Sequence, residues 1–293
     1  MITHMTRSNT LGLRVADLGL WLDAGNSSVQ LTVDPCHARF LSTSALGDDL
    51  VLRLRDGPPR TTDGWKSVFY DAGTWQLWLD RAGRFVFAAP RGSPPRRQLV
   101  VDAAFAAGEI IGEFRSMAAQ GQTVYPLQDM DVVLYANWLA NYGDLILHAS
   151  GMAIDGRGYA FAGPAGSGKS TLVTALVGAP ATVLGEDTVI LRHKDGRFWI
   201  YGTPWHLDPE RCSPEGVPLE KLFFLERRGG HSAQPLPPAD GVARLLQTAF
   251  VPYYRPDAVS RILGTLSHLA GQVPFYTLSF HLGADVMQLI EEA

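Results

Sequence analysis

A glycine-rich stretch in the second half of the chain constrains the fold more than any other feature. It reads Gly163-Pro164-Ala165-Gly166-Ser167-Gly168-Lys169-Ser170 and fits the pattern G-x-x-x-x-G-K-[ST], with Thr171 directly after it. An apolar run at residues 159–162 precedes it, and residues 172–177 have the composition of a helix. A strand, a glycine loop and a helix in this order predict a phosphate-binding loop, because the loop turns its N–H groups inward and the helix start adds unpaired ones. The alternative is a glycine-rich turn that only joins strand to helix, which would not require the full pattern.

The loop provides a set of candidate phosphate ligands. They are Gly163, Ala165, Gly166, Ser167, Gly168, Lys169, Ser170 and Thr171. In loops of this kind the lysine supplies a cation to the phosphates, and the serine hydroxyl is a ligand of Mg²⁺. We therefore expect Lys169 to face a phosphate group and Ser170 to face a magnesium ion.

Two adjacent carboxylates, Glu186 and Asp187, follow the loop and its helix after a short apolar segment at residues 181–184. Metal-assisted phosphoryl transfer needs one carboxylate near the metal and another that accepts a proton from the incoming hydroxyl. We expect Ser170 and Asp187 to be metal ligands, and either Glu186 or Asp187 to act as the base. The alternative is a pair of exposed acids on a tight turn.

Composition excludes several classes of protein. The chain has 293 residues, 46% of them hydrophobic and 18% charged, as expected of a folded globular protein. A net charge of −4 without a basic block argues against a nucleic-acid partner, and no apolar run is long enough to predict a membrane span. The N-terminus lacks a signal-peptide core, and Cys36 and Cys212 lack metal-ligand spacing, so we expect a cytoplasmic protein.

The order of segments predicts a β-rich first part and an α/β second part. Residues 1–10 are expected to be a flexible N-terminus, and residues 11–124 an antiparallel β region. Its predicted strands are residues 18–22, 28–33, 50–54, 75–79, 84–88 and 98–101, with a hairpin turn at 80–83 and a proline-rich loop at 91–97. A helix is predicted over residues 129–142. Residues 145–154 and 159–162 then form a hairpin that leads into the glycine loop, with His148 on its first arm.

Beyond the loop helix, which residues 178–180 should end, the pattern alternates strands and helices. Strands are expected at residues 181–184, 188–191, 197–202, 219–226 and 274–280, helices at 240–250, 258–270 and 285–292, and a break at 235–238.

The second part of the chain resembles the HPr kinase/phosphorylase group and its shorter relatives, the HPr-kinase-like serine kinases. The resemblance rests on His148 before the loop, on residues 163–171, and on the pair Glu186-Asp187, and it covers roughly residues 125 to 293. In that family the pair usually begins with Asp, so Glu186 is one methylene longer. The N-terminal β region has no comparable match.

The resemblance implies a phosphoenolpyruvate-carboxykinase-like P-loop core that transfers the γ-phosphoryl of ATP to a serine hydroxyl, with Mg²⁺ as cofactor. Some relatives phosphorylate the C-terminal serine of a lasso peptide, which makes a small peptide or a protein the expected acceptor. Relatives also assemble into oligomers, which is compatible with a homo-oligomer here.

Several side chains have alternative roles in this scheme. Lys169 would offset phosphate charge, and His148 would orient a carboxylate, contact the γ-phosphate, or be a core residue. Arg211 and Lys221 are candidates for a further cation, and His206 for the acceptor pocket. Two other functions remain open: a nucleotide-responsive binding or assembly module, and a simple NTPase.

Overall fold

The computed structural model divides into two compact units, Met1–Trp138 and Leu139–Ala293, which we describe separately. It describes residues 9–25, 27–44, 49–70, 76–89, 97–121, 123–128, 130–176, 181–227, 230–281 and 285–293. Most of the expected flexible N-terminus, most of the proline-rich loop and the predicted helix stop at residues 178–180 lie outside these ranges. The contacts group residues 125–138 with the first unit, whereas the sequence places the start of the second domain at residue 125.

The described part of the first unit contains one mixed sheet of nine strands. Their order is β3-β1-β2-β4-β9-β8-β7-β6-β5. The strands are β1 (Thr10–Val15), β2 (Leu18–Asp23), β3 (Leu41–Ser42), β4 (Leu50–Asp56), β5 (Lys66–Tyr70), β6 (Gln76–Leu79), β7 (Phe85–Ala89), β8 (Arg97–Val101) and β9 (Ala107–Gly112). The predicted hairpin turn joins β6 to β7, where the Asp80 carboxylate accepts hydrogen bonds from the N–H groups of Ala82 and Arg84, each at 2.9 Å.

Two expectations for this region are wrong. The sheet is not purely antiparallel, because β4 runs parallel to both β2 and β9. Alternation of polar and apolar residues shows which face of a strand is buried, but it carries no information about the direction of its partner. Residues 28–33 do not form a strand; Leu31 makes a single bridge to Val124 instead.

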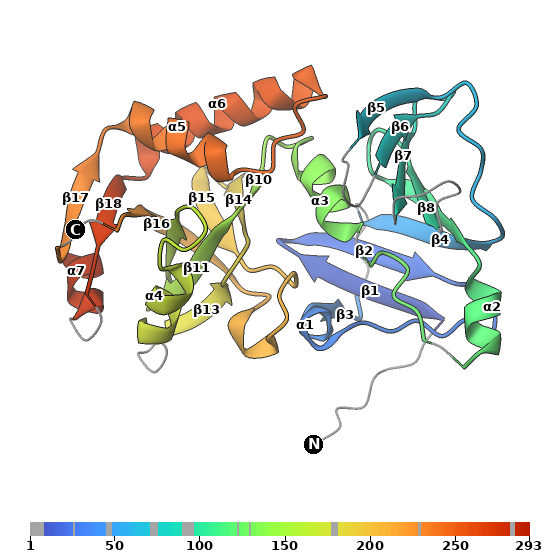
Figure 1. Ribbon diagram of the computed structural model, residues 1–293, viewed down its shortest axis with the longest axis horizontal. Helices are drawn as coiled ribbons and strands as arrows, with labels where there is room; N and C mark the ends of the chain where they lie inside the picture. The colour runs from blue at the N-terminus through green and yellow to red at the C-terminus, as the bar shows by residue number, and fades with distance from the viewer. Residues whose placement is uncertain are drawn as a thin grey trace. The chain divides into compact units, whose positions relative to one another are not determined.

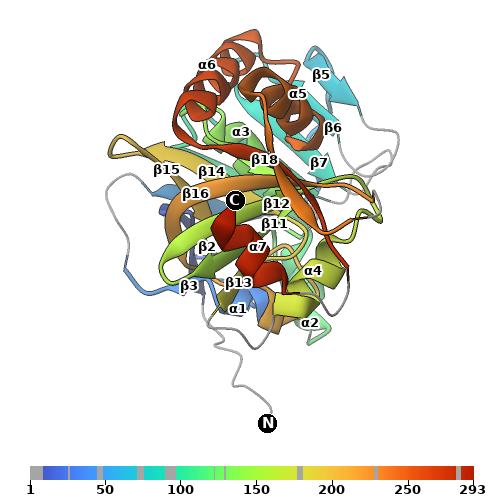
Figure 2. The ribbon, with the colours of Figure 1, turned by 90° about the vertical axis from the view of Figure 1, so that its left-hand side faces the viewer.

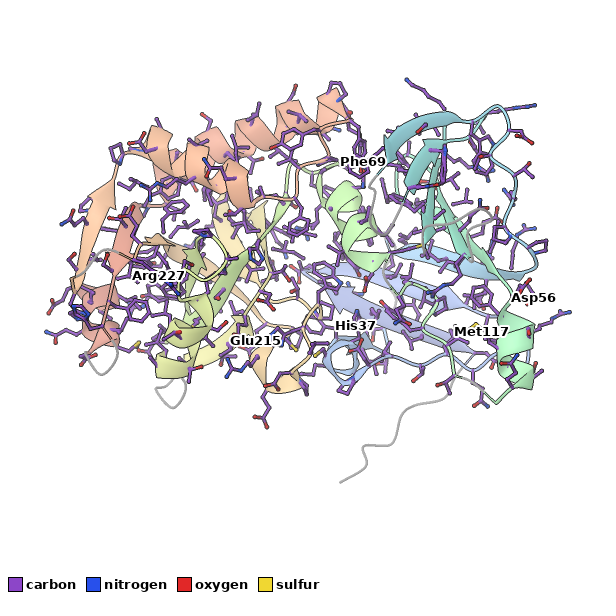
Figure 3. The ribbon with its side chains drawn as sticks, viewed as in Figure 1. His37, Asp56, Phe69, Met117, Glu215 and Arg227 are labelled. Atoms are coloured by element: carbon purple, nitrogen blue, oxygen red, sulfur yellow. The ribbon has the colours of Figure 1, made fainter. Side chains whose placement is uncertain are left out.

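Three helices accompany this sheet: α1 (Pro35–Ala38), α2 (Phe114–Ala119) and α3 (Asp131–Leu139). His37, labelled in Figure 3, lies on α1 and is buried. Its Nδ1 lies 2.7 Å from Asp34 Oδ2, and its Nε2 lies 2.8 Å from Asp131 Oδ2 at the start of α3. This bridge connects two segments that are far apart in the sequence.

The second unit contains a further nine-stranded sheet among its described residues. Its main path is β10-β14-β15-β16-β12-β11-β13, and β18 pairs with β16 and β17. The strands are β10 (Leu145–Leu147), β11 (Ala149–Ile154), β12 (Arg157–Ala162), β13 (Ala181–Gly185), β14 (Val189–Lys194), β15 (Arg197–Tyr201), β16 (Gly216–Leu225), β17 (Ser232–Leu236) and β18 (Phe275–Ser279). The helical segments are α4 (Lys169–Leu176), the short 3₁₀ turn η1 (Pro209–Arg211), α5 (Pro238–Thr248), α6 (Pro256–Gln272) and α7 (Val286–Glu292).

Helices cover both faces of this sheet, as Figures 1 and 2 show: α5 and α6 lie on one side, α4 and α7 on the other. Alternation along β12 explains the arrangement. Ala160 and Ala162 pack in the core with α5 and α6, whereas Tyr159 and Phe161 pack in the core with α4 and α7. The unit is therefore a mixed α/β layer structure, with its central strands buried on both faces.

One predicted break is wrong. Pro235 lies inside β17, which pairs with β18 at the edge of the described sheet. An edge strand tolerates proline, because it pairs on one side only and the missing N–H can face the side that has no neighbouring strand. In the described part of the chain, no helix is both long and apolar enough to cross a membrane.

Candidate functional site

The glycine loop lies between β12 and α4, as the sequence predicts. Gly166 and Gly168 have φ values of 74° and 106°, in the region that favours glycine. Gly163 is constrained in a different way, because a Cβ there would lie 2.6 Å from the Ser167 hydroxyl and would force this side chain to move. Each of these three positions therefore has a local physical reason to favour glycine.

The Lys169 ammonium is folded back onto its own loop. Nζ donates to the carbonyl of Gly163 at 2.7 Å and lies 3.3 Å from that of Pro164. Burial lowers the pKa of Lys169, although the charge of Asp187 acts in the opposite direction. The buried Ser167 hydroxyl has no hydrogen-bond partner among the described residues. The loop thus holds a buried cation and an unsatisfied hydroxyl, both of which an anion in the loop would engage.

His148 and the acidic pair both lie where one strand ends and the next begins. β10 pairs with β14, and β11 pairs with β13, with Leu147 opposite Val189 and Gly151 opposite Gly185. His148 lies at the junction between β10 and β11 rather than on an arm of the hairpin. The Ser150 hydroxyl donates to the carbonyl of Glu186 at 2.5 Å and fixes the turn.

The Glu186 carboxylate is buried and forms an ion pair with Arg211, whose Nη1 lies 2.6 Å from Glu186 Oε2. Arg211 Nη2 also donates to Thr174 Oγ1 of α4 at 3.4 Å. Burial alone would raise the pKa of Glu186, but the Ser170 and Arg211 side chains, together with the nearby positive charge, lower it. Glu186 therefore lies close to the helix that begins in the glycine loop.

His206 connects the two acids. Its Nε2 lies 3.4 Å from Asp187 Oδ2 and 3.7 Å from Glu186 Oε2. Its Nδ1 lies 2.9 Å from the backbone N and 3.2 Å from the carbonyl oxygen of Asp208, which hold the ring in place. Asp187 is the more accessible acid, with 53% of its side chain exposed.

The other predicted residues differ in position. Arg211 lies at the acidic pair. Lys221 does not, because its ammonium donates to the carbonyls of Ile290 and Glu291 at the end of α7, each at 3.0 Å. The His148 side chain makes no hydrogen bond or ion pair with the residues that the structure describes, and its backbone N–H donates to Thr248 O at 2.8 Å. Thr171 is exposed in the first turn of α4.

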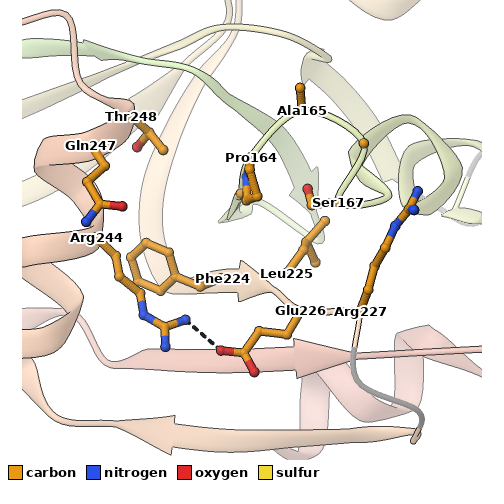
Figure 4. A pocket seen from close by; sticks show the side chains of 12 residues that line it. Pro164, Ala165, Ser167, Phe224, Leu225, Glu226, Arg227, Arg244, Gln247 and Thr248 are labelled. Atoms are coloured by element: carbon orange, nitrogen blue, oxygen red, sulfur yellow. Dashed lines mark hydrogen bonds and ion pairs between the residues drawn. The ribbon is translucent and has the colours of Figure 1, made fainter.

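A cavity of about 670 Å³ adjoins the first half of the loop. Residues 163–167 form one wall, Phe224 to Arg227 a second, and Arg244, Gln247 and Thr248 of α5 a third (Figure 4). Arg244 pairs with Glu226 at 2.8 Å, and Arg227 points toward the loop in Figure 4, with Nη2 3.8 Å from a Cβ placed on Gly166. Sequence reasoning missed these residues, because they follow a buried strand or lie on a helix without any motif.

Metal-ligating side chains are sparse here. No group of three or more His, Cys, Asp or Glu residues within the described ranges could hold a metal ion by itself. A magnesium ion that is shared with substrate phosphates needs only one or two protein carboxylates, so this donor set is compatible with one.

Comparison with known proteins gives one family. The family model described as "SynChlorMet cassette protein ScmC" matches residues 111–293, more than half of the chain. No curated protein matches. Among solved structures, the HPr(Ser) kinase/phosphatase from Coxiella burnetii is similar at 14% identity and a TM-score of 0.31, over 50% of this chain and 86% of that one.

Proposed function

We propose that this chain, which belongs to the SynChlorMet cassette protein ScmC family, is an ATP-dependent kinase that phosphorylates a serine hydroxyl of a peptide or protein. The observation that carries the proposal is the double contact of Arg211, which lies 2.6 Å from the buried Glu186 carboxylate and 3.4 Å from the Thr174 hydroxyl of α4, the helix that begins in the loop. It connects a phosphate-binding loop to an acidic pair, which is the combination that metal-assisted phosphoryl transfer uses. A lasso-type peptide is one acceptor that fits this chemistry.

The loop residues fit ATP with Mg²⁺. Phosphate oxygens would replace the loop carbonyls as partners of Lys169, and they would satisfy the buried Ser167 hydroxyl. Ser170 and an acid of the pair would hold the magnesium ion, which offsets negative charge on the phosphates when bound. Asp187 is the acid that the sequence suggests for this place, but the burial of Glu186 and its lowered pKa, to which Ser170 contributes, favour Glu186.

The two acids would then have different tasks. Glu186 has a lowered pKa and an ion pair with Arg211, so it is a weak proton acceptor. Asp187 is more accessible and contacts His206. We therefore propose that Asp187 accepts the proton of the serine hydroxyl while the serine oxygen forms its bond to the γ-phosphorus and the bond to ADP breaks. Arg211 and Arg227 would offset charge on either side of the loop.

Incubation with γ-labelled ATP and serine-containing peptides, followed by mass spectrometry, tests this function. The expected result is label on a serine. Lys169→Ala should lower transfer at least about a hundredfold, and Asp187→Asn by about 10²- to 10⁴-fold with nucleotide binding retained. Lys194→Ala, which removes an exposed lysine at the end of β14, is the matched control and should transfer at the wild-type rate.

Two outcomes favour other functions. Free phosphate without a labelled peptide would indicate an NTPase. ATP binding that changes partner contacts, and that Glu186→Gln and Asp187→Asn leave intact, would indicate a nucleotide-responsive module. Unchanged transfer by folded Lys169→Ala would contradict the proposed site.

A further inference from the structure

A second cavity, of about 420 Å³, lies on the sheet of the first unit. Four arginines line it, Arg53 and Arg55 of β4 together with Arg60 and Arg84, around Glu109 of β9. We call these five residues the arginine cavity. Arg53 is the register partner of Glu109, and Arg55 lies two positions further along β4 on the same face. The sheet itself therefore assembles this cluster.

Buried contacts hold the cluster in place. The Glu109 side chain is 11% exposed and contacts Arg55 Nε and Arg60 Nη2, while Arg84 Nη1 lies 4.0 Å away. The fully buried Gln98 fixes Arg60 by two hydrogen bonds to its backbone, accepting from N at 2.7 Å and donating to O at 2.8 Å. These contacts orient Arg60 before any ligand is present, which lowers the entropy cost of binding one.

Positive charge exceeds negative charge in the lining. Four arginines face two acids, Glu109 and Asp102, which leaves an excess of two positive charges (4 − 2) in a chain whose net charge is −4. The Asp102 carboxylate accepts from the N–H groups of Ala106 and Ala107 at 3.1 and 2.9 Å. Arg84 also pairs with Asp80, just outside the cavity, at 2.7 Å. Arg53 is exposed and makes no hydrogen bond or ion pair within the described residues.

We propose that the arginine cavity binds the carboxylates of an acidic peptide segment. Guanidinium groups present paired N–H donors that match a planar carboxylate, and Glu109 uses only part of this capacity. Val100 in the cavity wall is itself part of a buried cluster with Val86 and Ile111, against which Trp65 and Trp78 pack, so the base of the cavity is held by the core of the sheet. The cavity residues lie outside the matched range 111–293, and the proposal does not depend on the kinase activity.

Fluorescence anisotropy with a short labelled peptide of alternating Glu and Gly tests this site on the full chain. The expected result is saturable binding that added salt weakens and that the matching Gln and Gly peptide lacks. Arg53→Gln should weaken binding about tenfold, as expected for one charge-assisted hydrogen bond. Arg115→Gln is the matched control, since it removes one exposed arginine from α2 and should leave the affinity unchanged.

A variant that is expected to bind the peptide more tightly distinguishes a binding role of the cavity from a purely structural one. Glu109→Gln removes the carboxylate that competes for Arg55 and Arg60, so it should tighten peptide binding severalfold while thermal unfolding verifies the fold. Equal affinity of wild type, Arg53→Gln and Glu109→Gln, or equal binding of the Glu and Gln peptides, would overturn the proposal. Tighter binding of a single-stranded oligonucleotide that Arg53→Gln also weakens would reassign the cavity to nucleic acid.

Discussion

His206 is the residue whose position changes the interpretation of the acidic pair most. The family resemblance directs attention to His148, yet the imidazole near both carboxylates belongs to His206. Sequence reasoning could propose Lys169, Ser170, Glu186 and Asp187 as site residues because a motif with known spacing contains or follows them. It could not predict that His206 lies beside the two acids, because a separate loop brings this residue there and no local sequence pattern indicates the contact.

We expect His206→Ala to lower kcat for phosphoryl transfer about tenfold to a hundredfold, with little change in the KM for ATP, because Asp187 loses the donor that orients it. His206→Gln keeps an N–H near the position of Nε2 and should restore part of the rate. Steady-state kinetics of the two variants, with thermal unfolding as the control, check this. Equal rates for the Ala and Gln variants would show that His206 does not orient the acid through its N–H.

How many of the strands and helices could be predicted depends on the kind of pattern that the sequence carries. Alternating or β-branched segments predicted β2, β4, β6 and β7, and helical periodicity predicted α5 and α6. Strand partners and their directions could not be predicted, since the parallel pairing of β4 depends on tertiary packing. Edge strand β17 was missed because the proline that argued against a strand is tolerated there.

At the loop between β12 and α4, the left-handed conformation of Gly168 makes a specific prediction. Alanine at φ 106° is strained, so Gly168→Ala should lower the free energy of unfolding by about 1–2 kcal/mol and also weaken nucleotide binding. Gly264→Ala is the matched control, because Gly264 lies inside α6 with open space around its Cβ position and should gain about 1 kcal/mol. Urea unfolding measures both. Equal effects at the two positions would contradict the assignment of strain to the loop.

At the scale of the whole chain, the first unit contains a buried bridge between His37 and two aspartates whose charge depends on pH. Burial alone would lower the pKa of His37, but the hydrogen bonds and charges of Asp131 and Asp34 raise it to about 9. A raised pKa means that the folded state binds a proton more tightly than the unfolded state. The stabilisation by this bridge is therefore complete below the ordinary histidine pKa of about 6.5 and is lost as the pH rises through 9.

This linkage predicts that the first unit becomes less stable between pH 6.5 and pH 9, by an amount on the order of 3 kcal/mol if the bridge is lost completely. His37→Gln should be less stable than wild type at pH 6.5 and should lose most of this pH dependence, because no group remains to release the proton. Urea unfolding of both proteins across this range measures the difference. Because His37 joins α1 to α3 in the first unit, the pH dependence should be confined to the transition of that unit, and parallel profiles for wild type and variant would show that the bridge is not charged.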